Sequence, residues 1–503
     1  MGSWNGYRRL MLALLLVVLP VLPLFARDIH VDPQAGDDSS PSGPVATIRQ
    51  AIRMAQPGDT IHLRPIVYRE YAGFYGVRGE PGKPITLDGH GATLEGSDPL
   101  KPDQWQEAGT DLYRCDDLLP YLDDAVIQRW FLLWDGKMQH MGRTSKGASA
   151  PLKEPENLQP GEWTFVKEVG KQSPRPQQIS GAFYVKLPPG QKLADANIFV
   201  PTRSAGVQFS GTGPNHNAHL VIRNLTATHP YNDGFNIHGH CEDVLFENIQ
   251  AIECGDDGIS AHETAQYRVD GFVSIGNSTG ICDTGASETS YDRVFIRDCL
   301  AFDLYFLDSG RYSVRNAVVL SSAARTLYLT GREASERPCS LALDNVFIRR
   351  MTNSNEVRVS KGSVFDARRL TLLGLNFQAT GGEVNLYESV VAGVSTVGEL
   401  PATYDYIMKT PRPGTLMSEI VLWRDVQWAA DRNLYGVRSL RLDQTTYTAE
   451  NFSEYQMQTE QDTASRWDAS GVNDAKIDAR LNALEMLVVP ESERRRMAGL
   501  ANP

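Results

Sequence analysis

The sequence predicts an all-β protein that folds as a right-handed parallel β-helix, a solenoid with an N-terminal capping helix and an inserted β-rich subdomain. The first observation is a repeat: Asp233 and Asp257 are 24 residues apart, and His238 and His262 have the same spacing. The second is that short apolar segments followed by polar turn residues recur along much of the chain. Such a period matches one turn of a β-solenoid, in which each turn packs only on its neighbours.

Residues 1–26 are expected to be a secretory signal peptide. Arg8 and Arg9 precede an apolar run that contains two prolines. A basic start followed by a short apolar segment is typical of a cleaved export signal, and an uncleaved anchor is the alternative. We therefore expect a secreted, periplasmic or cell-surface protein.

Residues 27–98 are expected to form an N-terminal cap and the first turns of the β-helix. Within them, residues 47–55 place Ile48, Ala51 and Ile52 on one face at helical spacing. A helix at this end would cover strand edges that would otherwise promote aggregation.

Residues 99–200 interrupt the repeat with strand-like segments and frequent proline, which predicts an inserted β-rich subdomain. Four tryptophans lie in it: Trp105, Trp130, Trp134 and Trp163. They are interpreted either as the core of this subdomain or as an aromatic wall on which sugars stack.

The repeat continues through residues 201–400, which are expected to form the β-helix core and hold the active site. Residues 401–503 are expected to form a C-terminal cap and an exposed helical tail, with a helix over 474–488.

The net charge of -12 does not indicate a basic surface for binding nucleic acid, although arginines do recur through residues 293–369. The six cysteines lack CxxC spacing, so a structural zinc site is not expected, and one or two disulfides stay open.

Strand alternation places side chains of the repeat on the outer face of the helix. Phe235 and Ile237 would point inward, and Asn236 and His238 outward. Asp233 and Asp257 would lie one turn apart, with Asp256 beside them. Like charges this close raise at least one pKa, and a protonated carboxyl beside ionised ones is the arrangement that glycoside hydrolysis uses. Turn bracing by the aspartates and calcium binding with Glu263 are alternatives.

The two aspartate motifs resemble those of the polygalacturonases of glycoside hydrolase family 28, within the pectate-lyase-like β-helix superfamily. The motifs are Asn232-Asp233-Gly234 and, one turn later, Gly255-Asp256-Asp257-Gly258. The resemblance implies that Asp256 is the general acid and that Asp233 and Asp257 activate water for an inverting displacement.

Two features depart from that family. The Gly-His-Gly turn expected another turn on reads Ser278-Thr279-Gly280, and no basic pair lies near residues 304–307. His238 and His262 are expected to take over part of the histidine role. Arg325, two turns past Thr279 in the same column, is expected to bind an acidic group.

The sequence therefore predicts a secreted carbohydrate-active enzyme, a glycoside hydrolase acting on a polysaccharide or oligosaccharide. The expected catalytic residues are Asp256, Asp257 and Asp233. The expected substrate-binding residues are His238, His262, Asn236, Glu263 and Arg325. We expect a monomer with no cofactor, no nucleic-acid partner and no membrane contact beyond the signal peptide. The alternatives are a polysaccharide lyase or uronate epimerase with calcium and a histidine base, and a non-catalytic glycan-binding or structural β-helix.

Overall fold

The computed structural model describes residues 26–40, 43–116, 118, 122–140, 142, 151–168, 178–332, 335–351, 356–393, 418–468 and 475–497. The expected signal peptide, apart from Ala26, lies outside the described residues. None of the helices in the described ranges has the length and apolar character that crossing a bilayer requires.

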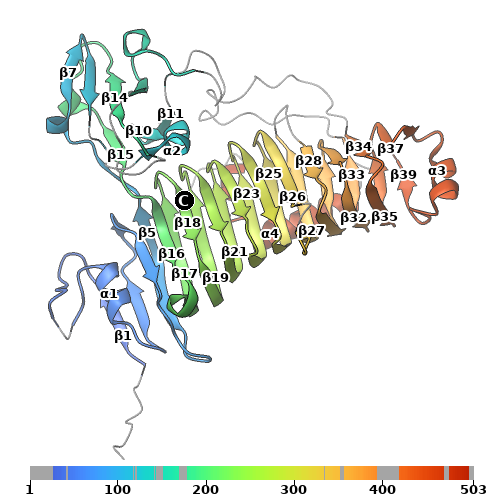
Figure 1. Cartoon of the computed structure of the whole chain (residues 1–503), viewed down its shortest axis with the longest axis horizontal. Coiled ribbons are helices and arrows are strands. Elements are labelled where there is room, and N and C mark those ends of the chain that lie inside the picture. The colour runs from blue at the N-terminus through green and yellow to red at the C-terminus, as the bar shows by residue number, and fades with distance from the viewer. Residues whose placement is uncertain are drawn as a thin grey trace, which may run out of the picture.

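The chain is a parallel β-helix whose coils stack along the long axis of the molecule (Figure 1). One sheet, here the short-strand sheet, has one strand from each coil. Its members are β4 (Ala72–Tyr75), β16 (Ala205–Ser210), β18 (Asp233–Ile237), β20 (Asp257–Ala261), β22 (Thr279–Asp283), β24 (Phe302–Asp308), β26 (Arg325–Gly331), β28 (Glu356–Val359), β31 (Asn376–Ala379), β34 (Glu419–Leu422), β37 (Ser439–Leu442) and β38 (Thr445–Tyr447). Its strands pair in parallel until β38, which turns back antiparallel on β37.

The second sheet, here the long-strand sheet, forms the other faces of the coils. Its members are β1 (Asp28–Val31), β2 (Thr60–Leu63), β3 (Val67–Tyr68), β5 (Ile85–Glu95), β17 (Asn217–Thr228), β19 (His240–Ile252), β21 (Thr264–Ile275), β23 (Glu288–Arg297), β25 (Arg311–Ser321), β27 (Cys339–Arg350), β29 (Ser363–Arg368), β30 (Thr371–Leu373), β32 (Gly382–Tyr387), β33 (Val390–Ala392), β35 (Val426–Asp431), β36 (Leu434–Gly436) and β39 (Arg466–Trp467).

The long strands bend where a residue adopts the left-handed conformation. Asn224 and Asn248 occupy this corner in successive coils, with φ of 54° and 50°. Asparagine tolerates this region better than most residues. The Asn248 side-chain amide donates to the Asn224 side-chain carbonyl at 3.4 Å, so the corner residues also bond along the solenoid axis.

The core lies inside the coils and is one continuous apolar stack. Phe235 pairs in register with Ile259, and both are fully buried. Phe235 and Ile237 therefore point inward as predicted, because strand alternation and the repeat period agree.

The predicted N-terminal capping helix is present as α1 (Ile48–Met54). The Thr47 side chain accepts a hydrogen bond from the backbone N–H of Gln50, and Ile48, Ala51 and Ile52 are buried against the first coils. The apolar face of the helix thus closes the end of the core.

Between β5 and β16 the chain leaves the solenoid and forms small antiparallel sheets, which lie to one side of the N-terminal coils (Figure 1). Their elements are β6 (Ser97–Pro99), β7 (Gln106–Gly109), β8 (Leu112–Cys115), β9 (Leu122–Asp123), α2 (Asp124–Arg129), β10 (Phe131–Trp134), β11 (Lys137–His140), β12 (Trp163–Lys167), β13 (Gln178–Ile179), β14 (Gly181–Lys186) and β15 (Ile198–Pro201). Single 3-10 turns occur at Pro102–Gln104, Pro155–Asn157, Leu193–Asp195 and Gly213–Asn215.

The four tryptophans of this region do not form a sugar-stacking wall. Trp105, Trp130, Trp134 and Trp163 are at most 7% exposed and form one apolar cluster with β14 and β15. The core interpretation is therefore the correct one, because their rings are used for packing.

At the C-terminal end, α3 (Phe452–Thr459) packs its buried Phe452 and Tyr455 against the last coils. The chain then returns along the solenoid as α4 (Ala475–Val488) and α5 (Glu491–Met497). The expectation of an exposed helical tail is wrong. Leu484 and Val488 pack on outward apolar side chains of the long-strand sheet, and Glu493 pairs with Arg297 at 2.8 Å.

The six cysteines, all of which lie in the described ranges, form no disulfide, and all but Cys282 are buried. The disulfide alternative is therefore wrong, and the buried thiols pack as small apolar side chains.

Candidate active site

Three carboxylates meet at the beginning of two neighbouring strands of the short-strand sheet. Asp233 begins β18, Asp257 begins β20, and Asp256 lies in the turn just before it. One carboxylate oxygen from each lies within 4.8 Å of those of the other two. The repeat had predicted this cluster, because residues one period apart are brought to adjacent rungs.

The glycine after each aspartate lets the coils approach closely at this point. A β-carbon on Gly234 would lie 2.7 Å from the carbonyl oxygen of Gly258, and one on Gly258 would lie 2.6 Å from that of Gly280. Both distances are too short for any side chain. The Asp-Gly pairs therefore place the carboxylates at a tight contact between coils.

Asp233 is the most enclosed of the three, with 2% of its surface exposed. It accepts hydrogen bonds from the backbone N–H of Asp257 at 3.1 Å and from the hydroxyl of Ser260 at 2.8 Å. Burial raises its pKa, while these two hydrogen bonds oppose the rise by stabilising the charged form. Asp233 thus joins two coils as well as belonging to the cluster.

Asp257 is 6% exposed. Burial raises its pKa well above the usual range, and the charges of Asp256 and Asp233 raise it further. The positive charge of Arg129 and a hydrogen bond with Thr279 act in the opposite direction. The three carboxyl groups therefore do not all ionise at neutral pH.

Asp256 is the member that solvent reaches, since its side chain is 21% exposed. Loss of hydration in this crowded position raises its pKa to about 7, although Arg129 lowers it. A carboxyl group with this pKa exists in both protonation states at neutral pH, which suits a proton donor.

Arg129 is the member of the site that sequence analysis missed. It is the last residue of α2, and its guanidinium donates to Asp256 at 2.6 Å and to the side-chain carbonyl of Asn232 at 3.3 Å. The next residue, Trp130, stacks on Tyr231 with ring centroids 5.7 Å apart. Nothing in the repeat pattern connects the inserted region with Asp256. One indirect indication of Arg129 was present in the sequence: three clustered carboxylates need a nearby cation.

His238 and His262 are stacked neighbours, as predicted from their equal spacing. Their ring centroids are 3.9 Å apart and the rings are 5° from parallel. Burial lowers the pKa of His262 to about 4, and the charge of His238 lowers it as well. His262 is therefore a neutral imidazole at neutral pH.

The remaining expected site residues lie on both sides of this pair. Asn236 is 5% exposed and accepts from Ser260 at 3.5 Å, between the carboxylates and the histidines. Glu263 accepts from the backbone N–H of Gly239 at 2.8 Å and contacts His238. Glu263 is thus a turn-bracing residue beside the histidines and is not part of the carboxylate cluster. Arg325 lies two rungs beyond Thr279, in the same column of the short-strand sheet.

The carboxylate cluster brings together three groups that could hold a metal ion, but it already has a cationic partner in Arg129. A calcium ion takes about six to eight oxygen ligands, whereas Asp233 already accepts two hydrogen bonds and Asp256 is paired with Arg129. The guanidinium supplies the positive charge that a cation would bring and would repel a second one. Glu263, which the calcium alternative needed, lies outside the cluster.

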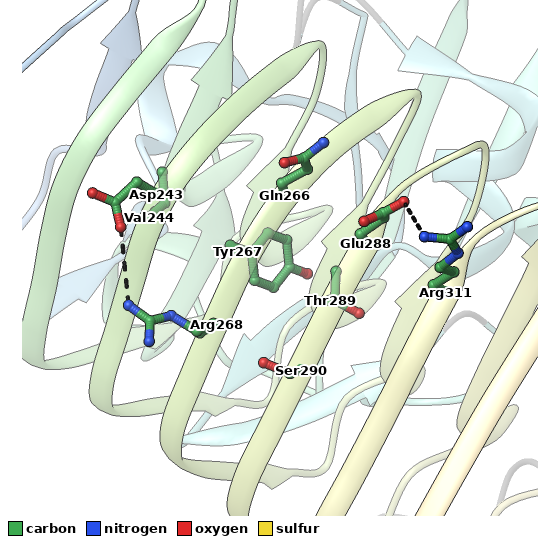
Figure 2. A pocket seen from close by; sticks show the side chains of 9 residues that line it. All are labelled: Asp243, Val244, Gln266, Tyr267, Arg268, Glu288, Thr289, Ser290 and Arg311. Carbon is green, nitrogen blue, oxygen red and sulfur yellow. Dashed lines mark ion pairs between the residues drawn. The ribbon is translucent and has the colours of Figure 1, made fainter. Parts of the chain in front are cut away.

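An open hollow of about 330 Å³ lies elsewhere, on the long-strand sheet (Figure 2). Its charged residues pair with each other: Arg268 lies 3.9 Å from Asp243, and Arg311 lies 3.6 Å from Glu288. The hollow is therefore separate from the carboxylate cluster, and its charges are already balanced.

Comparison with known proteins finds structural likenesses at low sequence identity. No protein-family model matches the sequence, and no curated protein matches it. Among solved structures, a complex of XylC with xylose is 11% identical and covers 88% of this chain and 86% of its own, with a TM-score of 0.47. A glycoside hydrolase is 12% identical over 94% of this chain and 100% of its own, with a TM-score of 0.46. A GH136 lacto-N-biosidase from Eubacterium ramulus is 9% identical over 88% and 67%, with a TM-score of 0.28. At such low similarity, the case for the site rests on its own geometry.

Proposed function

We propose that the protein is a glycoside hydrolase in which Asp256 is the general acid. The observation that carries the proposal is the cluster itself: three carboxylates with oxygens within 4.8 Å, of which the solvent-exposed one has a pKa of about 7. Glycosidases use one protonated carboxyl to donate to the leaving oxygen and a second, ionised carboxylate to act at the sugar carbon.

In the proposed reaction, Asp256 donates its proton to the glycosidic oxygen as the bond to the sugar breaks. The ionised carboxylate of Asp233 attacks the sugar carbon as the leaving group departs, and water then hydrolyses this glycosyl-enzyme ester and returns a proton to Asp256. Asp257, whose pKa is raised well above the usual range, stays protonated beside it. The two hydrogen bonds to Asp233 favour its ionised form, and Arg129 stabilises negative charge throughout the cluster. Arg129 also holds Asp256 in place, since the ion pair fixes its side chain.

The separation of the carboxylates supports retention of configuration. Inverting glycosidases leave about 6.5–9.5 Å between their two carboxyl groups for a water, whereas retaining enzymes have about 5–5.5 Å. The cluster, with oxygens within 4.8 Å, is closer to the second geometry. The resemblance to family 28 implied inversion, and the proposal departs from it here. Nuclear magnetic resonance of the first product anomer distinguishes the two outcomes.

The test of function is product analysis on a panel of plant and algal polysaccharides. We expect new reducing ends without ultraviolet absorbance, and their loss in Asp256→Asn. Asp425→Asn is the matched control, because Asp425 is exposed and pairs with Lys361 far along the solenoid. Absence of reducing ends on every glycan would contradict the proposal.

One observation favours a lyase or epimerase as the second candidate. The stacked imidazoles of His238 and His262 directly follow β18 and β20, the two strands that begin at the carboxylates, and this pair would supply the histidine base of such a reaction. A lyase would produce a double bond that absorbs ultraviolet light, and the Asp256→Asn variant would still form this product.

A further inference from the structure

Aromatic rings and guanidinium groups gather on the short-strand sheet beyond the carboxylates. We call them the aromatic–arginine patch: Phe302, Tyr305, Arg325, Tyr328 and Arg358. Thr279, which follows Asp257 in its column, is in register with Phe302, and Phe302 with Arg325. Since rungs are about 4.8 Å apart, Phe302 and Arg325 lie roughly 10 and 14 Å from Asp257 along the solenoid. The patch therefore continues the columns of the proposed active site.

The side chains of the patch hold one another in place. Phe302 and Tyr305 stack with centroids 4.1 Å apart and planes 2° from parallel. The guanidinium of Arg325 lies 5.5 Å from the centroid of Phe302 and 5.1 Å from that of Tyr328. Cation–π contacts of this kind orient a guanidinium without neutralising it.

The charge of Arg325 is not balanced by an ion pair within the described ranges. Within the described ranges, neither Arg325 nor Arg358 forms an ion pair, whereas arginines elsewhere on the solenoid do, such as Arg293 with Asp270. The neighbouring carboxylate of Glu356 accepts from the hydroxyl of Tyr328 at 2.6 Å and acts on Arg358 through its charge without forming an ion pair with it. On a protein with a net charge of -12, Arg325, which has no ion-pair partner in the described ranges and lies beside aromatic rings, indicates a site for an anion.

We propose that the aromatic–arginine patch binds an anionic sugar, so that the substrate is an acidic glycan. The proposal rests on the function proposed above and names its substrate class. A sugar ring face packs on the aromatic side chains, and its carboxylate or sulfate is bound by Arg325, whose planar fork matches such groups. The patch lies farther along the solenoid than Asp256. It would therefore bind a different sugar unit of the glycan from the one whose bond Asp256 breaks.

The test is binding to the full-length Asp256→Asn protein, which keeps the patch and removes turnover. The probes are uronate-containing and sulfated oligosaccharides, each with its carboxyl-reduced or desulfated counterpart. We expect tighter binding of one charged probe than of its neutral counterpart, with an affinity that falls as salt is raised. Arg325→Gln should weaken binding of the charged probe about tenfold to hundredfold and leave the neutral one unchanged. Arg325→Lys should recover part of the loss.

Arg315→Gln is the matched control, because Arg315 is exposed on the long-strand sheet and pairs with Asp292. Equal affinity for charged and neutral probes, or an equal loss of both in Arg325→Gln, would overturn the inference. Hydrolysis that depends on Asp256 without a charge preference would refute only this inference. Charge-selective binding at Arg325 without hydrolysis of any glycan would refute the proposed function and leave the patch standing. The uronate and sulfate probes distinguish the two sources of charge.

Discussion

Arg129 and Asp256 join the inserted strands to the solenoid through an ion pair of 2.6 Å. Arg129 ends α2, whereas Asp256 lies in the turn before β20, so the proposed acid is set by two regions of the chain. The inserted region therefore contributes to the electrostatics of the site and is more than a neighbour of it.

Replacing Arg129 should change the pH dependence of activity. Because the guanidinium favours ionised Asp256, Arg129→Gln should raise the pKa of Asp256, by roughly one unit or more for loss of an opposite charge at this distance. The alkaline limb of the kcat/KM profile should move to higher pH, and Arg129→Lys should restore it in part. Arg114→Gln, in the same inserted region, should leave the profile where it is. An unshifted profile in Arg129→Gln would show that the ion pair does not tune the acid.

Asp233 should matter for stability as well as for turnover, unlike Asp256. Its carboxylate accepts two hydrogen bonds from the next coil, so Asp233→Ala leaves a buried donor unpaired. The expected loss in the free energy of unfolding is about 1–3 kcal/mol, measured by urea titration. Ser260→Ala should lose part of the same stability. Equal stability of Asp233→Ala and the wild type would contradict the bracing role.

His229 should make stability depend on pH above neutrality. Its imidazole bonds Glu95 at 3.0 Å and Glu253 at 3.2 Å. Burial alone would lower the pKa of His229, but these carboxylates raise it to about 9. Because the pKa of His229 in the folded protein exceeds the ordinary histidine value of 6.5, the stabilisation is complete below pH 6.5 and is lost as pH rises through about 9. The free energy of unfolding, measured by urea titration at pH 6.5 and at about pH 9, should be lower at the higher pH in the wild type but not in His229→Gln. A similar decrease in His229→Gln would disprove the assignment.

Chelation should not affect activity. The cluster already has a cation, since the Arg129 guanidinium lies 2.6 Å from Asp256, and Asp233 already accepts two hydrogen bonds. Turnover in excess chelator should therefore equal turnover in buffer alone. A loss that added calcium reverses would instead support the lyase alternative.

The sequence was informative where the repeat determines neighbours. Asp233 with Asp257 and His238 with His262 are adjacent because a period of 24 residues brings equal offsets to adjacent rungs, and both pairs were predicted. The inward direction of Phe235 followed from alternation in the same way. The 24-residue period is visible within one segment of the sequence, so these neighbours can be predicted without knowing any contact between distant segments.

Contacts between distant segments could not be predicted in this way. Arg129 reaches Asp256 through packing of the inserted strands, for which the repeat provides no register. The packing of Leu484 and Val488 on the long-strand sheet was also missed, because one apolar helix face does not reveal which surface it covers. Glu263 was placed with the carboxylates by proximity in sequence, whereas the strand between them carries it to the histidine end.

The measurement that tests the central claim most directly compares two leaving groups in Asp256→Asn. General acid catalysis typically contributes about 10²–10⁴-fold, but only when the leaving oxygen needs a proton. With a natural glycan, turnover should fall by about that factor at an unchanged melting temperature. With an activated aryl glycoside of the same sugar, whose leaving group needs no proton, the rate of bond cleavage should be nearly that of the wild type. Equal losses on both substrates, or full activity on the natural glycan, would contradict the assignment of Asp256 as the general acid.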